Sequence, residues 1–146
     1  MGISIRVLIS CCVAMIAALL VVGAVSHGVI RHIVQTSPLW VAIGLGIRHS
    51  ALTKWAALPC FVFWLVLMEA IWLYLLGWAH ILSGTFSPIE IEMTLVVGSA
   101  SIVGIVGAMG MRGAIPVWSA TATTLLMAVL QVTAYRLSLL PQIAHR

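Results

Sequence analysis

Residues 55–82 read WAALPCFVFWLVLMEAIWLYLLGWAHIL, and this stretch decides the fold class of the chain. It contains 28 residues, and its one formally charged side chain, Glu69, lies close to its middle. A helix of this length is roughly 42 Å long, which exceeds the ~30 Å hydrocarbon core of a bilayer. The stretch therefore predicts a membrane-spanning helix that carries a carboxyl group near the centre of the membrane.

The composition of the whole chain is typical of a membrane protein. Of its 146 residues, 63% are hydrophobic and 7% are charged, and the mean hydropathy is +1.22; soluble domains carry about 25% charged residues. Apolar segments fill most of the length, so we expect one integral membrane domain over residues 1–146. The seven Lys and Arg residues lie near the ends of apolar runs, where they anchor the chain to lipid head groups. They form no cluster, so no nucleic-acid partner is expected.

Three further apolar runs predict three more membrane-spanning helices. The four predicted spans cover residues of about 7–30, 55–82, 91–111 and 115–135. Four spans return the chain to the side on which it started, so both termini are expected on the same side of the membrane. The distribution of Lys and Arg favours the outside for both. The predicted fold class is an all-α membrane protein built as a four-transmembrane-helix bundle.

The long connection between the first two spans contains a shorter helical segment. Ser37 and Pro38 form a helix-start signal, with Ser as the N-cap and Pro at the first helical position. The apolar run that follows, residues 39–47, is too short to cross a bilayer as a helix. We therefore expect a short interfacial or re-entrant helix between spans 1 and 2. The alternative is a fifth span over about residues 33–47.

The third span combines a helix-start signal with a face of small residues. Ser87 and Glu90 have the spacing of a capping box, in which each side chain satisfies a backbone N–H of the other. Small side chains let two membrane helices approach closely. The predicted helix-packing residues recur every four positions: Ala100, Gly104 and Ala108.

Polar residues inside the apolar spans are the candidates for a functional site. On the second span, Glu69 and His80 share one face, separated by roughly 16 Å along the axis. On the fourth span, polar residues recur at helical spacing and form a stripe that we expect to face inward or toward a partner. The predicted intramembrane polar site consists of Glu69, His80, Thr121, Thr124, Gln131 and Tyr135.

Three roles are open for Glu69. A protonated carboxyl group can donate a hydrogen bond to a Thr or Gln of the fourth span and so lock the bundle. Together with His80 it can form part of a proton path through the membrane. It can also contact another subunit.

No cofactor, metal or catalytic residue is predicted. His27 and His80 end two consecutive, antiparallel spans, so we expect them near opposite membrane faces, where they cannot share one haem. The histidines show no metal-site spacing, and Cys11, Cys12 and Cys60 lie inside apolar runs. The chain has no Asp and no Gly-rich phosphate loop, so nothing in it favours an enzyme.

The expected function follows from the small-residue faces and the lack of a catalytic set. We expect a small multi-pass membrane protein that serves as an accessory or structural subunit in the lipid bilayer. It would pack against itself, as a homo-oligomer, or against other membrane subunits. The alternative is a small proton- or cation-coupled transporter or channel that uses Glu69, and a membrane-embedded enzyme acting on lipid is a second alternative. A compact chain of this kind suits a bacterial inner (cytoplasmic) membrane.

Overall fold

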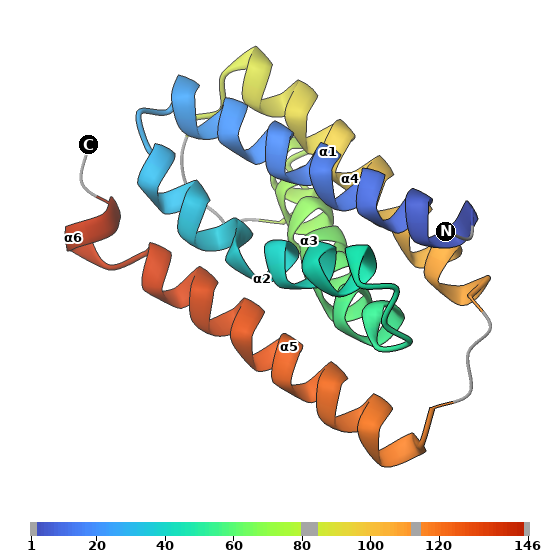
Figure 1. Ribbon diagram of the computed structural model, residues 1–146. Helices are drawn as coiled ribbons and strands as arrows, with labels where there is room; N and C mark the ends of the chain where they lie inside the picture. Colours follow the sequence, from blue (N-terminus) through green and yellow to red (C-terminus); the bar gives the residue numbers. More distant parts are fainter. Residues whose placement is uncertain (1–2, 80–84, 112–114, 145–146) are drawn as a thin grey trace.

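The computed structural model describes residues 3–79, 85–111 and 115–144, and the regular structure in these ranges is helical (Figure 1). Along these ranges the helices are α1 (Ile3–Val25), α2 (Val29–Ile47), α3 (Thr53–Leu75), α4 (Pro88–Met109), α5 (Val117–Ser138) and α6 (Pro141–Ala144). Four of them, α1, α3, α4 and α5, are long and apolar enough to cross a membrane. The predicted all-α class and the four predicted spanning helices are confirmed, and both indicate an integral membrane protein.

Two spans end earlier than their apolar runs, because the backbone turns left-handed. α1 stops at Val25 rather than at residue 30, since His27 has φ 57° and the N–H of Gly28 bonds back to the carbonyl of Gly23 at 2.8 Å. α3 stops at Leu75 rather than at residue 82, since Gly77 has φ 74°. Such left-handed residues end helices by satisfying the last carbonyls. The 28-residue apolar run is therefore not one helix.

The largest difference from the prediction is α2. One helix of 19 residues replaces the short helix expected for residues 39–47, and Pro38 lies inside it instead of at its start. Pro38 has no N–H to donate to the carbonyl of Val34. The hydroxyl of Ser37 donates to that carbonyl at 2.8 Å instead, so the helix continues through the proline. The Ser-Pro pair, which the sequence pattern predicted as a helix start, thus lies inside a helix. The Ser37 hydroxyl replaces the one backbone hydrogen bond that Pro38 cannot make.

α1 and α2 form an antiparallel hairpin that is in close contact at both ends. Near the turn, a Cβ on Gly23 would lie 2.9 Å from Cδ2 of His32. Near the opposite end, a Cβ on Gly46 would lie 3.0 Å from Cγ1 of Ile9. Glycine at both positions permits this approach. α2 therefore runs back along most of α1.

This extra pass changes the placement of the termini. α1 to α5 alternate in direction, so that α1 begins at one end of the bundle, whereas α5 ends and α6 lies at the other (Figure 1). A contact at the end where α1 begins supports these directions. There, Nζ of Lys54 at the start of α3 donates to the carbonyl of Met111, which follows α4, at 3.4 Å. The expectation that both termini lie on the same side does not fit this arrangement.

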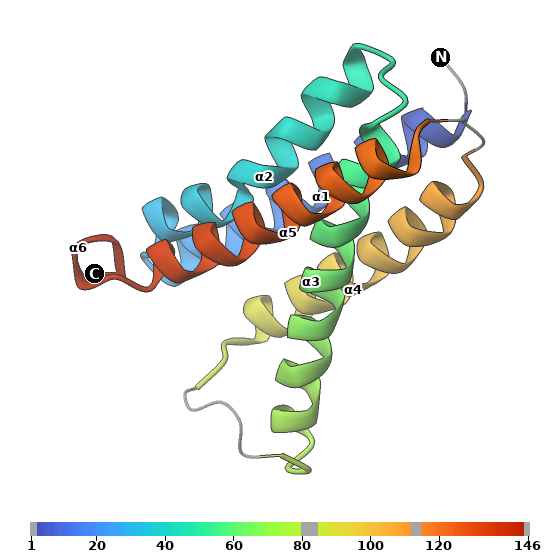
Figure 2. The ribbon, with the colours of Figure 1, turned by 90° about the horizontal axis from the view of Figure 1, so that it is seen from below.

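The bundle is uneven in direction and in burial. α3 crosses the common direction of α1, α4 and α5 at a steep angle, and the end of α3 projects beyond them (Figure 2). α1 is the most enclosed of the four candidate spans. In its apolar stretch of 18 residues 44% is buried, whereas the corresponding value for α5 is 22%. α1 packs mainly on α4 and α2, and α3 packs on α4 and α5. The core lies where α1, α3 and α4 meet.

The small residues of α4 lie at this meeting point. Ala100, Gly104 and Ala108 are all buried. A Cβ on Gly104 would lie 2.6 Å from two ring carbons of Phe61 on α3, closer than a real contact allows. The start of α4 has the expected capping box, in which the Ser87 N–H donates to the Glu90 carboxylate at 2.7 Å and the Glu90 N–H donates to the Ser87 hydroxyl at 3.3 Å.

Gly104→Ala should destabilise the protein, because the added methyl group must displace the Phe61 ring. We expect a loss of about 1–3 kcal/mol, the usual range for overpacking. Gly98→Ala on the same helix is the matched control, since its Cβ would find only Met68 Cβ, at 4.0 Å. Thermal unfolding of both variants in one detergent gives the comparison, and equal midpoints would contradict the close α3–α4 contact.

The alternating helices also predict that the two termini lie on opposite sides of the membrane. Single cysteines at Ser4, Thr85 and Gln142, in a background without Cys11, Cys12 and Cys60, test this. Among the described cations, Arg6, Arg48 and Lys54 lie at the end where α1 begins, and Arg31 and Arg136 lie at the other end. The excess is one cation, so by the positive-inside rule we expect the first end in the cytoplasm. An impermeant maleimide on intact cells should label Thr85→Cys and Gln142→Cys but not Ser4→Cys. Equal labelling at Ser4 and Gln142 would restore the four-span topology.

Candidate functional site

The structure does not gather the predicted polar residues into one intramembrane site. Gln131 is buried, Thr124 and Tyr135 are half-buried, and Glu69 and Thr121 are exposed on different helices. His80 lies outside the described residues. Each partly buried member of the stripe on α5 has its own neighbour, and none of these neighbours is Glu69.

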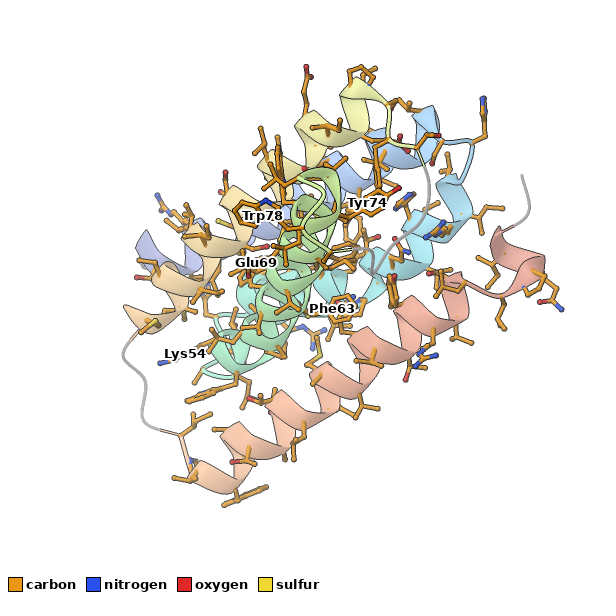
Figure 3. All side chains as sticks on the ribbon, turned by 180° about the vertical axis from the view of Figure 1, so that it is seen from behind. Lys54, Phe63, Glu69, Tyr74 and Trp78 are labelled. Carbon is orange, nitrogen blue, oxygen red and sulfur yellow. The ribbon has the colours of Figure 1, made fainter. Side chains whose placement is uncertain are left out.

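Glu69 lies on the outer side of α3 (Figure 3). The exposed side chains around it on this helix are apolar: Val62 is 48% exposed, Val66 is 62% exposed and Leu76 is 54% exposed. No hydrogen bond or ion pair joins its carboxyl group to another residue in the described ranges. The bond to a Thr or Gln of the fourth predicted span, by which Glu69 was expected to lock the bundle, is therefore absent from the described contacts.

The early end of α3 also changes the depth of Glu69. The residue lies six positions before Leu75, the last residue of the helix, which corresponds to roughly 9 Å along the axis. The sequence had placed it near the middle of a longer helix. The carboxyl group thus lies on an apolar surface, less than two helical turns from the end of α3.

The stripe on α5 holds the bundle together through α2 and α3. Nε2 of Gln131 donates to the carbonyl of Gln35 at 3.3 Å, and Nε2 of Gln35 donates to the hydroxyl of Ser138 at 2.9 Å. All three side chains are buried. The Thr124 hydroxyl donates to the carbonyl of Trp55 at 3.4 Å. These bonds join α5 to α2 at one end and to α3 at the other.

Tyr135 completes the stripe with an aromatic contact. Its ring meets the ring of Phe63 on α3 edge to face, with the centroids 5.4 Å apart. Phe63 in turn packs edge to face on Trp64, with the centroids 5.8 Å apart. The fourth predicted span is therefore polar on the side that meets α2 and α3, as the interhelical hydrogen bonds of membrane proteins require.

A cavity at one end of the bundle was not predicted from the sequence. It has a volume of about 280 Å³ and lies where α1 and α3 end and α2 and α4 begin. α2 contributes Arg31, His32 and Gln35 to its wall, and α4 contributes Glu90. The helical spacing of the long connection could have indicated these residues. The positions that α2 buries recur every three or four residues on both sides of Pro38: His32, Gln35, Thr36, Leu39, Ala42, Ile43 and Gly46.

Comparison with known proteins identifies no family. No family model, no curated protein and no solved structure matches the chain. The arguments for function therefore come from the residues themselves.

Metal ligands do not gather in the described ranges. These residues contain no group of three or more His, Cys, Asp or Glu side chains that could hold a metal ion. Cys11, Cys12 and Cys60 are free and buried. His27 lies at the turn after α1, at the same end as His32. The polar features that remain for function are the exposed Glu69 and the cavity.

Ser138→Ala should weaken the contact between α5 and α2. The change removes the hydroxyl that accepts from Gln35 and leaves a buried amide N–H without a partner. We expect a loss of roughly 1 kcal/mol, the scale of one interhelical hydrogen bond in a membrane protein. Thr133→Ala, at an exposed position of the same helix, is the control. Chemical or thermal unfolding in detergent should separate the two variants, and identical curves would show that the Gln35–Ser138 bond contributes nothing.

Proposed function

We propose that the chain is an accessory or structural subunit of a membrane complex and that it docks through the exposed side of α3 around Glu69. The observation that carries this proposal is the exposure of a carboxyl group on an otherwise apolar helix surface. A carboxyl group facing lipid costs up to a few kcal/mol, depending on its depth. A neighbouring helix that supplies a hydrogen-bond donor removes this cost and gives the contact its specificity.

The shape of the bundle supports docking at this place. The end of α3 projects beyond the other helices (Figure 2), and Glu69 is exposed within the last two turns of this helix. Val62, Val66 and Leu76 offer apolar contact on either side of the carboxyl group. A polar group at the centre of an apolar contact is the usual pattern for specific association of membrane helices.

The charge of Glu69 favours a different chain as the partner. In a symmetric pair of copies, two Glu69 carboxyl groups would meet, and like charges disfavour this unless a proton is shared. The described Lys and Arg residues of this chain lie near helix ends and not beside Glu69. A partner helix with Arg, Lys, Asn or Gln at matching depth fits better than a second copy. A bacterial inner membrane as the site of this complex is part of the same proposal.

Glu69→Leu should abolish co-purification of the partner without affecting the isolated chain. The wild-type protein, extracted in mild detergent, should bring out a stoichiometric partner, and the variant should retain it at least about tenfold less. Glu92→Leu, which replaces an exposed acid on α4, is the matched control and should retain the partner. Thermal stability of the isolated Glu69→Leu protein should change by less than about 0.5 kcal/mol, because the site is exposed.

Three results would contradict the proposal. The first is a wild-type protein that is extracted from the membrane without a partner, and the second is a Glu69→Leu variant that keeps its partner. The third is a pH-gradient-driven ion flux in proteoliposomes that Glu69→Gln abolishes at unchanged stability. That flux would identify Glu69 as a coupling acid and favour a transporter.

A further inference from the structure

The cavity between α1, α2, α3 and α4 changes in character along the bundle axis. At the end of the bundle its wall carries Arg31, His32 and Glu90. Closer to the middle the wall is mostly apolar, with Leu67, Met93 and Val97, and the polar side chains that also line it are Gln35, Thr94 and Tyr135. A polar end followed by an apolar interior matches an amphiphile whose head group lies at the membrane surface.

Unpaired polar atoms gather around this cavity. Among the described residues, four buried side-chain nitrogen or oxygen atoms have no hydrogen-bond partner: Arg31 Nε, His32 Nδ1, Trp64 Nε1 and Gln131 Oε1. Three of the four belong to residues of the cavity wall. Trp64 is 2% exposed and His32 is 9% exposed, so bulk water does not satisfy them. Buried groups without partners are rare in folded proteins, so this cluster offers hydrogen-bonding atoms to a polar ligand or to water in the cavity.

The charges in the wall narrow the class of ligand. Arg31 offers a fixed cation at the polar end, which suits the oxygens of a phosphate group. Trp64 offers an N–H donor deeper in the cavity, one helical turn beyond Leu67 on α3. Glu90 brings a carboxylate to the same wall, and no ion pair joins it to Arg31. One oxygen of Glu90 already accepts from the N–H of Ser87. The carboxylate disfavours a purely anionic head group and favours one that also carries an amine.

We propose that this cavity binds a membrane phospholipid, with its phosphate at Arg31, an amine of its head group toward Glu90, and the start of an acyl chain along the apolar wall. The volume of about 280 Å³ equals roughly nine water molecules at ~30 Å³ each. It accommodates a head group and the first part of a chain, and the remaining chain lies in the bilayer. This proposal is independent of the docking surface around Glu69, which lies on the exposed side of α3.

Native mass spectrometry of the protein released from nanodiscs tests this proposal directly. The discs contain phosphatidylethanolamine and phosphatidylglycerol in equal amounts, and the mass of each retained lipid identifies its head group. We expect the wild-type protein to retain one phospholipid, with phosphatidylethanolamine in excess. Arg31→Gln should lower retention about tenfold, since it removes a charge-assisted hydrogen bond from a desolvated site.

Two variants serve as controls for charge and for folding. Arg48→Gln removes an exposed arginine at the opposite end of α2 and should leave retention unchanged. Glu90→Gln keeps a side chain that can complete the capping box at the start of α4, so the helix start is preserved. It should abolish the preference for phosphatidylethanolamine over phosphatidylglycerol while total retention remains.

Several outcomes would overturn the proposal. They are a wild-type protein that retains no lipid, equal retention by Arg31→Gln and wild type, and equal losses in Arg31→Gln and Arg48→Gln. Displacement of the lipid by inorganic phosphate alone would show a site for a free anion instead. A preference for phosphatidylethanolamine that persists in Glu90→Gln would refute the assignment of the amine to that carboxylate.

Discussion

The hydrocarbon interior of a bilayer offers no hydrogen bonds to the backbone, and this constraint governs the course of the whole chain. It applies at Pro38, where the backbone lacks a donor for the carbonyl of Val34. The hydroxyl of Ser37 supplies the missing bond and keeps α2 continuous over 19 residues. Because α2 is continuous, the chain reverses direction once more than the count of clearly apolar segments suggests. The directions of α3, α4 and α5 all depend on that reversal.

Close packing and a few polar bonds hold these helices together. Lipid tails are as apolar as leucine side chains, so the hydrophobic effect does little to join helices inside a membrane. The chain meets this condition with glycines where helices touch, at Gly23, Gly46 and Gly104. It adds a buried polar chain in which Gln131 bonds to Gln35 and Gln35 bonds to Ser138. Both devices lie at helix contacts, and α2 takes part in most of them.

The sequence was a good guide to what depends on composition and local chemistry. Length and hydropathy predicted the membrane class and the four apolar helices, and Ser87 with Glu90 predicted the start of α4. It was a poor guide where two local signals compete. Ser37 and Pro38 have the pattern of a helix start, and only the hydrogen bond to Val34 shows that the helix passes through them.

The candidate site was harder to predict because it depends on which face of each helix is covered. Hydropathy cannot distinguish a carboxyl group that faces the bundle interior from one that faces outward, so Glu69 was placed correctly in a helix but not on its exposed side. The left-handed Gly77 shortened that helix and moved Glu69 toward its end. The cavity residues of α2 were missed with the helix that carries them.

The burial of α1 has a consequence for the order in which the protein assembles. A chain is synthesised from its N-terminus, so α1 reaches the membrane before the other described helices, although it is the most enclosed of the candidate spans. Its cover on one side, α2, follows after a short turn, but α4 on the other side is made much later. Until then that side of α1 faces lipid, which it tolerates because α1 carries no charged residue after Arg6. Although α1 precedes the other described helices along the chain, it is thus among the last of them to be fully covered.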